Sequence, residues 1–190
     1  MKVFLGGSIQ LNALPAQVKQ LLAEEISHGS SFAVGDAAGI DLAFQQFLKS
    51  QSLSALTVFH SDILRNNIGN WPTEFVPSGL KASGKEKYTV KDRRMAELSD
   101  CGIMVWDGKS AGTLANVLDL LQQKKPCQIF LAPRDRIYLV NTLQELDEIL
   151  RSEDYREVFD EANKRLARFK RRAKKSASPI HEHPTLPGFD

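Results

Sequence analysis

The chain has 190 residues, of which 42% are hydrophobic and 25% are charged. These values are typical of a globular domain, and they exclude collagen-like, fully disordered and membrane-spanning proteins. No stretch approaches the ~18 apolar residues that a spanning helix needs, and the start MKVFLGGSIQ becomes glycine-rich too early for a signal peptide. We therefore expect a cytoplasmic protein that does not contact a membrane.

The net charge of +2 conceals an asymmetry along the chain. Residues 164–175, KRLARFKRRAKK, contain eight basic residues and no acidic one, so the rest of the chain holds 17 basic against 23 acidic residues. The sequence therefore indicates an acidic body with a basic C-terminal segment. Cys101 and Cys127 each open an apolar run without a histidine nearby. We assign them no chemistry, because disulfides are rare in the cytosol.

Short apolar runs alternate with helical patterns through the first two-thirds of the chain. In the helical patterns, apolar residues recur three and four positions apart, as Ile40, Ala43, Phe44 and Phe47 illustrate. Repeated strand–helix units of this length predict a Rossmann-like three-layer α/β sandwich with a mainly parallel sheet. In chain order we predict strand 2–5, helix 15–26, strand 31–34, helix 39–49, strand 55–59, helix 90–98, strand 101–106, helix 111–122 and strand 127–131.

A long connection, residues 60–88, separates the third strand from the next helix. Loops of this length in a compact domain are usually functional or disordered. Apolar residues such as Ile63, Ile68 and Trp71 favour order. We interpret the connection as a lid or wall beside the site.

The C-terminal part is predicted to be a helical extension. Helical patterns cover 142–150 and 153–175, and the second has its acidic half before its basic half, as the helix dipole favours. Their apolar faces would either form a homodimer or pack on the sheet. Residues 176–190 are rich in proline and polar residues, which predicts disorder. We divide the chain into a Rossmann-like domain at 1–150, a basic helix at 151–175 and a disordered tail at 176–190.

Glycine-containing turns follow the first, second and fourth predicted strands. In open parallel sheets, ligands bind outside the carboxyl ends of the strands, where these turns would meet. The turn after the fourth strand is the most informative, because Ser110, Gly112 and Thr113 open a helix whose unpaired N–H groups favour an anion. Lys109 adds a positive charge. A capped strand–helix turn with packing glycines would use the same residues, and neither the P-loop nor the GxGxxG spacing is present.

Other residues at this edge have two interpretations each. Asp36 would bind a ribose hydroxyl or form the turn, and Asp41 would act in the site or cap a helix. Trp71 would stack on a base, with Asn67 beside it, or anchor the loop in the core. Four cations would reach phosphate or remain solvated: Arg65, Lys91, Arg93 and Arg94. We predict no metal and no cofactor. The predicted ligand-binding residues are Gly6, Gly7, Ser8, Gly35, Asp36, Gly39, Asn67, Trp71, Lys91, Arg93, Asp107, Gly108, Lys109, Ser110, Gly112, Thr113 and Asn116.

Two of these turns resemble a known superfamily. VGDAAGID resembles the GGAxGxD-type turn of the DNA-processing protein A and YspA-like branches, and MAELSDCGIMVWDGKSAGT resembles their RxMxxxxD…GGxGT segment. The combination and order, over roughly residues 1–131, are similar to the SLOG superfamily, which includes the Lonely guy phosphoribohydrolases and is close to the nucleoside deoxyribosyltransferases. The whole chain also resembles a bacterial family with the WDGKSAGT segment. The resemblance implies a Rossmann-like sheet that binds a nucleotide or a nucleotide-derived ligand.

The sequence departs from these enzymes where they carry a catalytic glutamate. In the PGGxGTxxE motif of Lonely guy enzymes, the position of the glutamate corresponds to Asn116, whose amide cannot act as a carboxylate nucleophile or base. The nearest acid is Asp119, one helical turn further on. Asp107 stands in place of the usual glycine or proline. It would repel a phosphate unless Lys109 or a metal compensated, or it would bind a sugar hydroxyl instead.

Three functions compete on this basis. The first is binding or sensing of a nucleotide-like small molecule. The second is hydrolysis or transfer at an N-glycosidic bond, for which Asp36, Asp41, Asp92 or Asp107 would have to supply the carboxylate beside the anomeric carbon. The third is DNA binding through the basic helix, which the acidic body disfavours.

Overall fold

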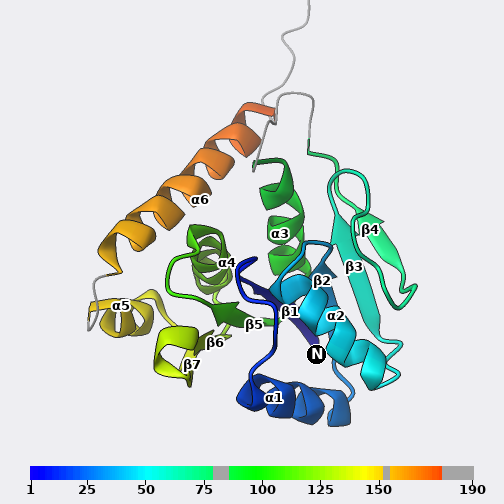
Figure 1. Cartoon of the computed structure of the whole chain (residues 1–190). Helices are drawn as coiled ribbons and strands as arrows, with labels where there is room; N and C mark the ends of the chain where they lie inside the picture. Colours follow the sequence, from blue (N-terminus) through cyan, green and yellow to red (C-terminus); the bar gives the residue numbers. More distant parts are fainter. Residues whose placement is uncertain (79–85, 152–154, 177–190) are drawn as a thin grey trace, which may run out of the picture.

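The computed structural model describes residues 1–78, 86–151 and 155–176. It has the predicted three layers, with helices on both faces of one sheet (Figure 1). The strands are β1 (Lys2–Gly7), β2 (Ser31–Gly35), β3 (Leu56–His60), β4 (Thr73–Phe75), β5 (Cys101–Trp106), β6 (Cys127–Leu131) and β7 (Arg136–Val140). The helices are α1 (Ala16–Ser27), α2 (Ile40–Ser50), α3 (Glu86–Leu98), α4 (Ala111–Gln122), the 3₁₀ turn η1 (Ala132–Arg134), α5 (Leu143–Arg151) and α6 (Arg156–Ser176).

The sheet has the strand order β4-β3-β2-β1-β5-β6-β7. All pairs are parallel except β6 and β7, which are antiparallel. The chain steps outward from β1 in both directions, so the strand order reverses between β1 and β5. This reversal is the switch point beside which open α/β sheets bind their ligands.

Each face of the sheet has its own apolar core. Val3 and Leu5 of β1 point into a core that α1 and α2 cover, whereas Phe4 points into the core under α3, α4, α5 and α6. This alternation is the two-residue period of a strand. Because both faces are covered, the central strands are continuous apolar runs, as predicted.

Two strands, β4 and β7, are not predicted from the sequence. β4 lies inside the connection 60–88 and has only three residues, so no alternation is visible there. β7 follows a turn in which Asp135 takes a left-handed conformation, with φ of 47°. Its sequence RIYLV contains the β-branched and aromatic residues typical of a strand. α3 begins at Glu86, four residues earlier than predicted.

α4 lies between the sheet and α6 and is buried on almost every side. Its sequence AGTLANVLDLLQ is accordingly apolar around most of its circumference. Ala162 and Leu166 place the first half of α6 in the same core, and Tyr155 directly before the helix also belongs to it. The apolar face of α6 thus packs within the chain, chiefly on α4 and not directly on the sheet as the second predicted alternative has it. The predicted disordered tail lies, from residue 177 on, outside the described residues. None of the helices in the described ranges is long and apolar enough to cross a membrane.

Candidate functional site

Ser8 and Asp107 meet directly across the switch point. Ser8 follows β1 and is completely buried, and its hydroxyl donates to Asp107 Oδ2 at 2.6 Å. The Ser8 N–H donates to the carbonyl oxygen of Val105 in β5 at 3.0 Å. The predicted ligand contact of Ser8 is thus replaced by a contact that joins the turns after β1 and β5.

Asp107 satisfies the N–H groups of its own turn. Its Oδ1 accepts from the backbone of Lys109 at 2.9 Å and of Ser110 at 2.7 Å. Burial alone would raise the pKa of Asp107, but the hydrogen bonds from Ser8 and these N–H groups outweigh it and lower the pKa. Asp107 is therefore ionised at neutral pH, and the turn already contains one negative charge.

The first turn of α4 has donors that the chain does not fully use. Ser110 Oγ accepts from the Thr113 N–H at 3.3 Å and from the Thr113 hydroxyl at 3.0 Å. The described part of the chain provides no acceptor for the N–H groups of Ala111 and Gly112. Arg165 of α6 lies over this turn, because a Cβ on Gly112 would be 3.6 Å from Arg165 Nη1. In the sequence Arg165 is one residue of the basic run, and no local pattern indicates its position over α4.

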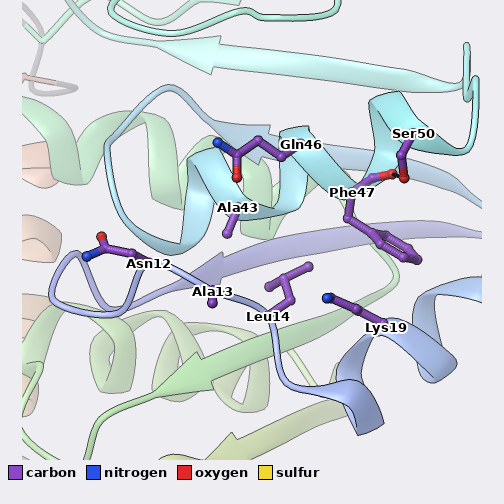
Figure 2. Close-up of a pocket in the computed structure, with 8 residues that line it drawn as sticks. All are labelled: Asn12, Ala13, Leu14, Lys19, Ala43, Gln46, Phe47 and Ser50. Atoms are coloured by element: carbon purple, nitrogen blue, oxygen red, sulfur yellow. Dashed lines mark hydrogen bonds between the residues drawn. The ribbon is translucent and has the colours of Figure 1, made fainter.

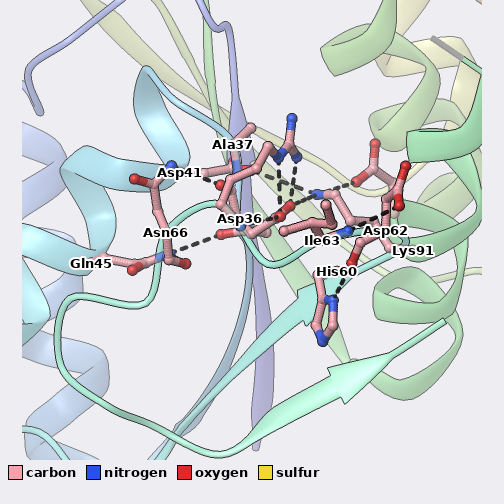
Figure 3. A network of polar contacts seen from close by, with 12 residues as sticks. Asp36, Ala37, Asp41, Gln45, His60, Asp62, Ile63, Asn66 and Lys91 are labelled. Atoms are coloured by element: carbon pink, nitrogen blue, oxygen red, sulfur yellow. Dashed lines mark hydrogen bonds and ion pairs between the residues drawn. The ribbon is translucent and has the colours of Figure 1, made fainter. Parts of the chain in front are cut away.

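A group of charges, the Lys91 cluster, gathers at the turn after β2 and is defined as Asp36, Asp41, Arg65, Lys91 and Asp92. Asp36 and Lys91 are buried in it, whereas Arg65 is exposed. Figure 3 shows Asp36, Asp41 and Lys91 in this network. Arg65 donates to both oxygens of Asp36, and its Nε–Oδ2 distance is 3.0 Å. Lys91 Nζ lies 3.8 Å from Asp36 Oδ1, 3.7 Å from Asp41 Oδ2 and 3.1 Å from Asp92 Oδ1. Lys91 was predicted to reach a ligand or stay solvated; it does neither in this arrangement, since its side chain is only 3% exposed.

Burial and ion pairing oppose each other in the Lys91 cluster. Burial would lower the pKa of Lys91, but the three carboxylates outweigh it and raise the pKa. Burial would raise the pKa of Asp36, but Arg65 and Lys91 lower it. For Asp41 burial prevails over Lys91 and raises the pKa to about 6. Lys91 and Asp36 are thus charged at neutral pH, and Asp41 is mostly so.

Gly35 and Gly39 are required by contacts within the protein. A Cβ on Gly35 would overlap the Asp41 carboxylate and Lys91 Nζ, so the absent side chain makes room for the Lys91 cluster. Gly39 has φ of +75°, and a Cβ there would lie 2.6 Å from the backbone of Ile9. Gly39 is also the N-cap of α2, which corrects the assignment of Asp41 as a cap; Asp41 instead accepts from the Ala37 N–H at 3.3 Å.

Trp71 and Asn67 belong to the core and to the loop, not to a base-binding surface. Trp71 is 7% exposed, and its indole N–H donates to the Leu53 carbonyl at 2.7 Å. The amide of Asn67 bonds both to the N–H and to the carbonyl of Trp71. These contacts correct the stacking prediction, because a buried ring offers no face to a base. The alternative of a loop anchored in the core is the one observed.

The connection after β3 is fastened to the turn after β2. Gln45 is completely buried, and its Nε2 donates to the carbonyls of Gly35 at 3.0 Å and Asn66 at 3.2 Å. Asn66 Nδ2 donates to the Asp36 carbonyl at 2.9 Å. This part of the connection is therefore ordered against the turn after β2, while its role as a lid or wall beside a ligand site stays a prediction. Gln45 was missed, because nothing in a helical pattern distinguishes a buried glutamine from an exposed one.

The other predicted residues are dispersed around this edge. Arg93 pairs with Glu97 at 3.3 Å and lies 3.8 Å from Asp119, at the contact of α3 with α4. Arg94 pairs with Glu74 at 2.9 Å. The remaining predicted residues differ in exposure: Gly6 and Gly108 are buried, Gly7 and Asn116 are half-buried, and Lys109 is exposed.

A separate hollow of about 250 Å³ lies between the loop after β1 and helices α1 and α2 (Figure 2). It contains none of the predicted site residues, and its side chains offer one cation, Lys19, beside apolar, amide and hydroxyl groups. We assign it no ligand. It is lined by Asn12, Ala13, Leu14, Lys19, Ala43, Gln46, Phe47 and Ser50.

No family model matches this sequence, and no curated protein matches it either. Among solved structures, the fold is similar to DNA processing protein A from Helicobacter pylori, which was described for its single-stranded DNA binding mode. The TM-score is 0.51 at 18% identity, over 86% of this chain and 80% of that chain. At this identity the similarity establishes a related Rossmann-like fold. It agrees with the predicted resemblance to DNA-processing protein A at the level of the fold, while membership of the SLOG superfamily remains a prediction.

Proposed function

We propose that the protein binds a phosphate-bearing ligand of the nucleotide class at the first turn of α4. The observation that carries this proposal is the position of the Arg165 guanidinium over Gly112. Two backbone N–H groups, the positive end of a helix dipole and a guanidinium converge there. Such donors bind phosphate strongly, because each bond is assisted by charge.

The turns after β1 and β2 are less suited to binding a phosphate. After β2, Lys91 is buried against Asp36, Asp41 and Asp92, and Arg65 pairs with Asp36. Arg165 also has a carboxylate partner, since its Nε lies 3.1 Å from Glu161 Oε1, but that pair is partly exposed and Arg165 Nη1 still faces Gly112. After β1, Ser8 is buried against Asp107. Of the turns after β1, β2 and β5, the turn after β5 is therefore the one that we propose for the phosphate.

Asp107 sets the orientation of such a ligand. It is ionised and would repel a phosphate placed beside it. The phosphate then lies on the Gly112 side of the turn, and a hydrogen-bond donor of the ligand, such as a sugar hydroxyl, faces Asp107. A nucleoside monophosphate provides both groups.

The proposal is tested by calorimetric titration with a nucleoside, the matching nucleoside monophosphate and inorganic phosphate. We expect the monophosphate to bind best, and Arg165→Met to weaken it about 10- to 100-fold, as the loss of a charge-assisted hydrogen bond implies. Lys164→Met is the matched control, because Lys164 is the exposed neighbour on α6. Equal losses in both variants, or no monophosphate that binds more tightly than millimolar, would refute the proposal.

Single-stranded nucleic acid is the second candidate ligand. Arg168 and Arg171 are exposed and follow Arg165 along α6. The similar structure also belongs to a protein that binds single-stranded DNA. If α6 binds a strand, affinity should fall steeply with salt, and Arg168→Ala with Arg171→Ala should reduce that salt slope by about one per cation. A flat salt response would leave the mononucleotide as the ligand.

The geometry does not support cleavage of an N-glycosidic bond. Asp36 and Asp41 are engaged in the Lys91 cluster, and Asp107 in its own turn. Asn116 provides an amide, not a carboxylate. This alternative therefore remains a prediction from resemblance and is not proposed.

A further inference from the structure

The two edges of the sheet differ in how they are protected against pairing with another strand. β4 has only three residues, with Pro72 directly before it and Pro77 close after it. Its central residue, Glu74, pairs with Arg94 at 2.9 Å. Short length, nearby prolines and charge are the usual means of protecting an edge strand.

β7 at the other edge lacks this protection. It has five residues, contains no proline and pairs along its whole length with β6. Among the described residues no strand pairs with its outer side, and it lies at the rim of the molecule (Figure 1). Leu139 is 61% exposed in the middle of this strand, and Leu143 at the start of α5 is 44% exposed. An unpaired strand edge with exposed leucines is a template for another strand.

The exposed leucine has a defined face. Ile137 packs against the core under α1 and α2, whereas Tyr138 and Val140 belong to the opposite core. Because side chains alternate along a strand, Leu139 shares the face of Ile137. Two apolar side chains of β7 thus stand on one side of the sheet, one partly buried and one exposed.

We propose that a second copy of this chain pairs antiparallel along the outer side of β7. A two-fold axis at Tyr138 would place Leu139 of each copy opposite Ile137 of the other, on the same face. The contact between Leu139 and Ile137 then forms twice, as a two-fold interface requires. The two sheets would then become continuous.

Charge favours this occupant over an unrelated strand. Arg134 at the end of η1 and Arg136 at the start of β7 flank Asp135, which leaves one net positive charge there, whereas Glu145, Asp147 and Glu148 on α5 follow the end of β7. Antiparallel pairing brings the basic end of each copy to the acidic end of the other, again twice. Such complementarity selects the partner and its direction. This interface differs from the predicted dimer through the last helices, whose apolar faces are buried in the core.

Sedimentation equilibrium of the full chain tests the proposal over about 1 to 200 µM, the range in which pairing of one strand from each copy becomes measurable. We expect a reversible dimer that Leu139→Lys weakens at least about 10-fold, because a lysine on an edge strand opposes pairing. Phe75→Lys on β4 is the matched control, since Phe75 is 58% exposed at the opposite edge. A monomer at every concentration, or a dimer that only Phe75→Lys weakens, would overturn the proposal.

Hydrogen exchange provides a readout that depends on the position of the interface. We expect the amides of β7 to exchange more slowly as the concentration of the natural chain rises, but not in Leu139→Lys. The amides of β4 should not respond. A dimer whose β7 amides exchange at a rate independent of concentration would place the interface elsewhere and overturn the proposal.

Discussion

The turns after β2 and β5 look alike in the sequence, but the chain places different charged groups at each of them. Each follows a buried strand, contains glycine and aspartate, and leads into a helix. The turn after β2 surrounds Lys91, a cation that the chain itself supplies from α3. The turn after β5 carries Asp107 and the exposed Lys109, and it leaves N–H groups of α4 beneath Arg165. Whether a glycine turn is open to a ligand thus depends on the counter-charge that the rest of the chain places there.

The difference assigns separate roles to the two turns. Asp36 and Lys91 are almost entirely buried, so the Lys91 cluster is expected to control stability. The first turn of α4 is half-exposed at Ser110 and Gly112, so it is expected to control binding. Substitutions in the two turns should therefore separate these properties.

The largest effect is expected from Lys91→Met, which keeps the length of the side chain and removes its charge. Asp41 would lose its cation, and Asp36 would keep only Arg65. Leaving buried charge unpaired costs about 3–5 kcal/mol of unfolding free energy. Urea denaturation at pH 7 measures this loss.

Arg94→Met on the same helix is the control. The Arg94 side chain is 44% exposed and pairs with Glu74 near the surface. Surface ion pairs contribute about 0–1 kcal/mol, so this variant should remain near the natural stability. Similar losses in the two variants would mean that Lys91 matters as part of α3 and not through its charge.

The next largest effect on stability is expected from replacing one glycine of each turn by alanine, which adds one methyl group. In Gly35→Ala the new Cβ would overlap Asp41 and Lys91, which predicts a loss of roughly 2–4 kcal/mol. In Gly112→Ala the nearest atom is Arg165 Nη1 at 3.6 Å, an ordinary contact. Alanine is also the better helix former by up to about 1 kcal/mol, so Gly112→Ala should be neutral or stabilising.

Thermal unfolding of both alanine variants, with monophosphate titration of Gly112→Ala, checks this pair. We expect Gly112→Ala to bind monophosphate more weakly while it unfolds no earlier than the natural chain. If Gly35→Ala were as stable as the natural chain, the close packing of the Lys91 cluster over Gly35 would be wrong.

The sequence predicted most of the sheet but only part of the site. The five inner strands, β1, β2, β3, β5 and β6, are apolar on both faces, and this signal is local, so the sequence predicts their positions. β4 and β7 lie at the edges, where apolar alternation weakens, and both were missed. In the same way Ser110 was recognised as a helix cap from its neighbours in the chain, whereas the position of Arg165 over Gly112 depends on how α6 crosses α4, which no local pattern encodes.

The residues of the Lys91 cluster show the same limit. Asp36, Asp41 and Lys91 were all singled out, but as ligand contacts. Lysine and aspartate are rarely buried unless they are paired, so each was expected at an accessible surface. Their pairing joins residues that lie about 55 positions apart in the chain, and only the packing of α3 against β2 and β3 reveals it.

The smallest effect is the pH dependence of stability, which distinguishes Asp41 from Asp36 within the Lys91 cluster. The pKa of Asp41 is raised from 3.8 to about 6, so its favourable contribution is complete below pH 4 and is lost as the pH rises through 6. Asparagine does not titrate. The unfolding free energy of Asp41→Asn, relative to that of the natural chain, should therefore rise by about 1–3 kcal/mol between pH 4 and pH 7.

The pKa of Asp36 is lowered, so its favourable contribution to stability is present above pH 4 and is lost only as the pH falls further. Asp36→Asn should therefore be less stable than the natural chain at pH 7, with a deficit that shrinks below pH 4. Urea unfolding of the three proteins from pH 3 to 8 distinguishes the two carboxyls, and a difference for Asp41→Asn that stays constant with pH would show that Asp41 is not held in a desolvated site.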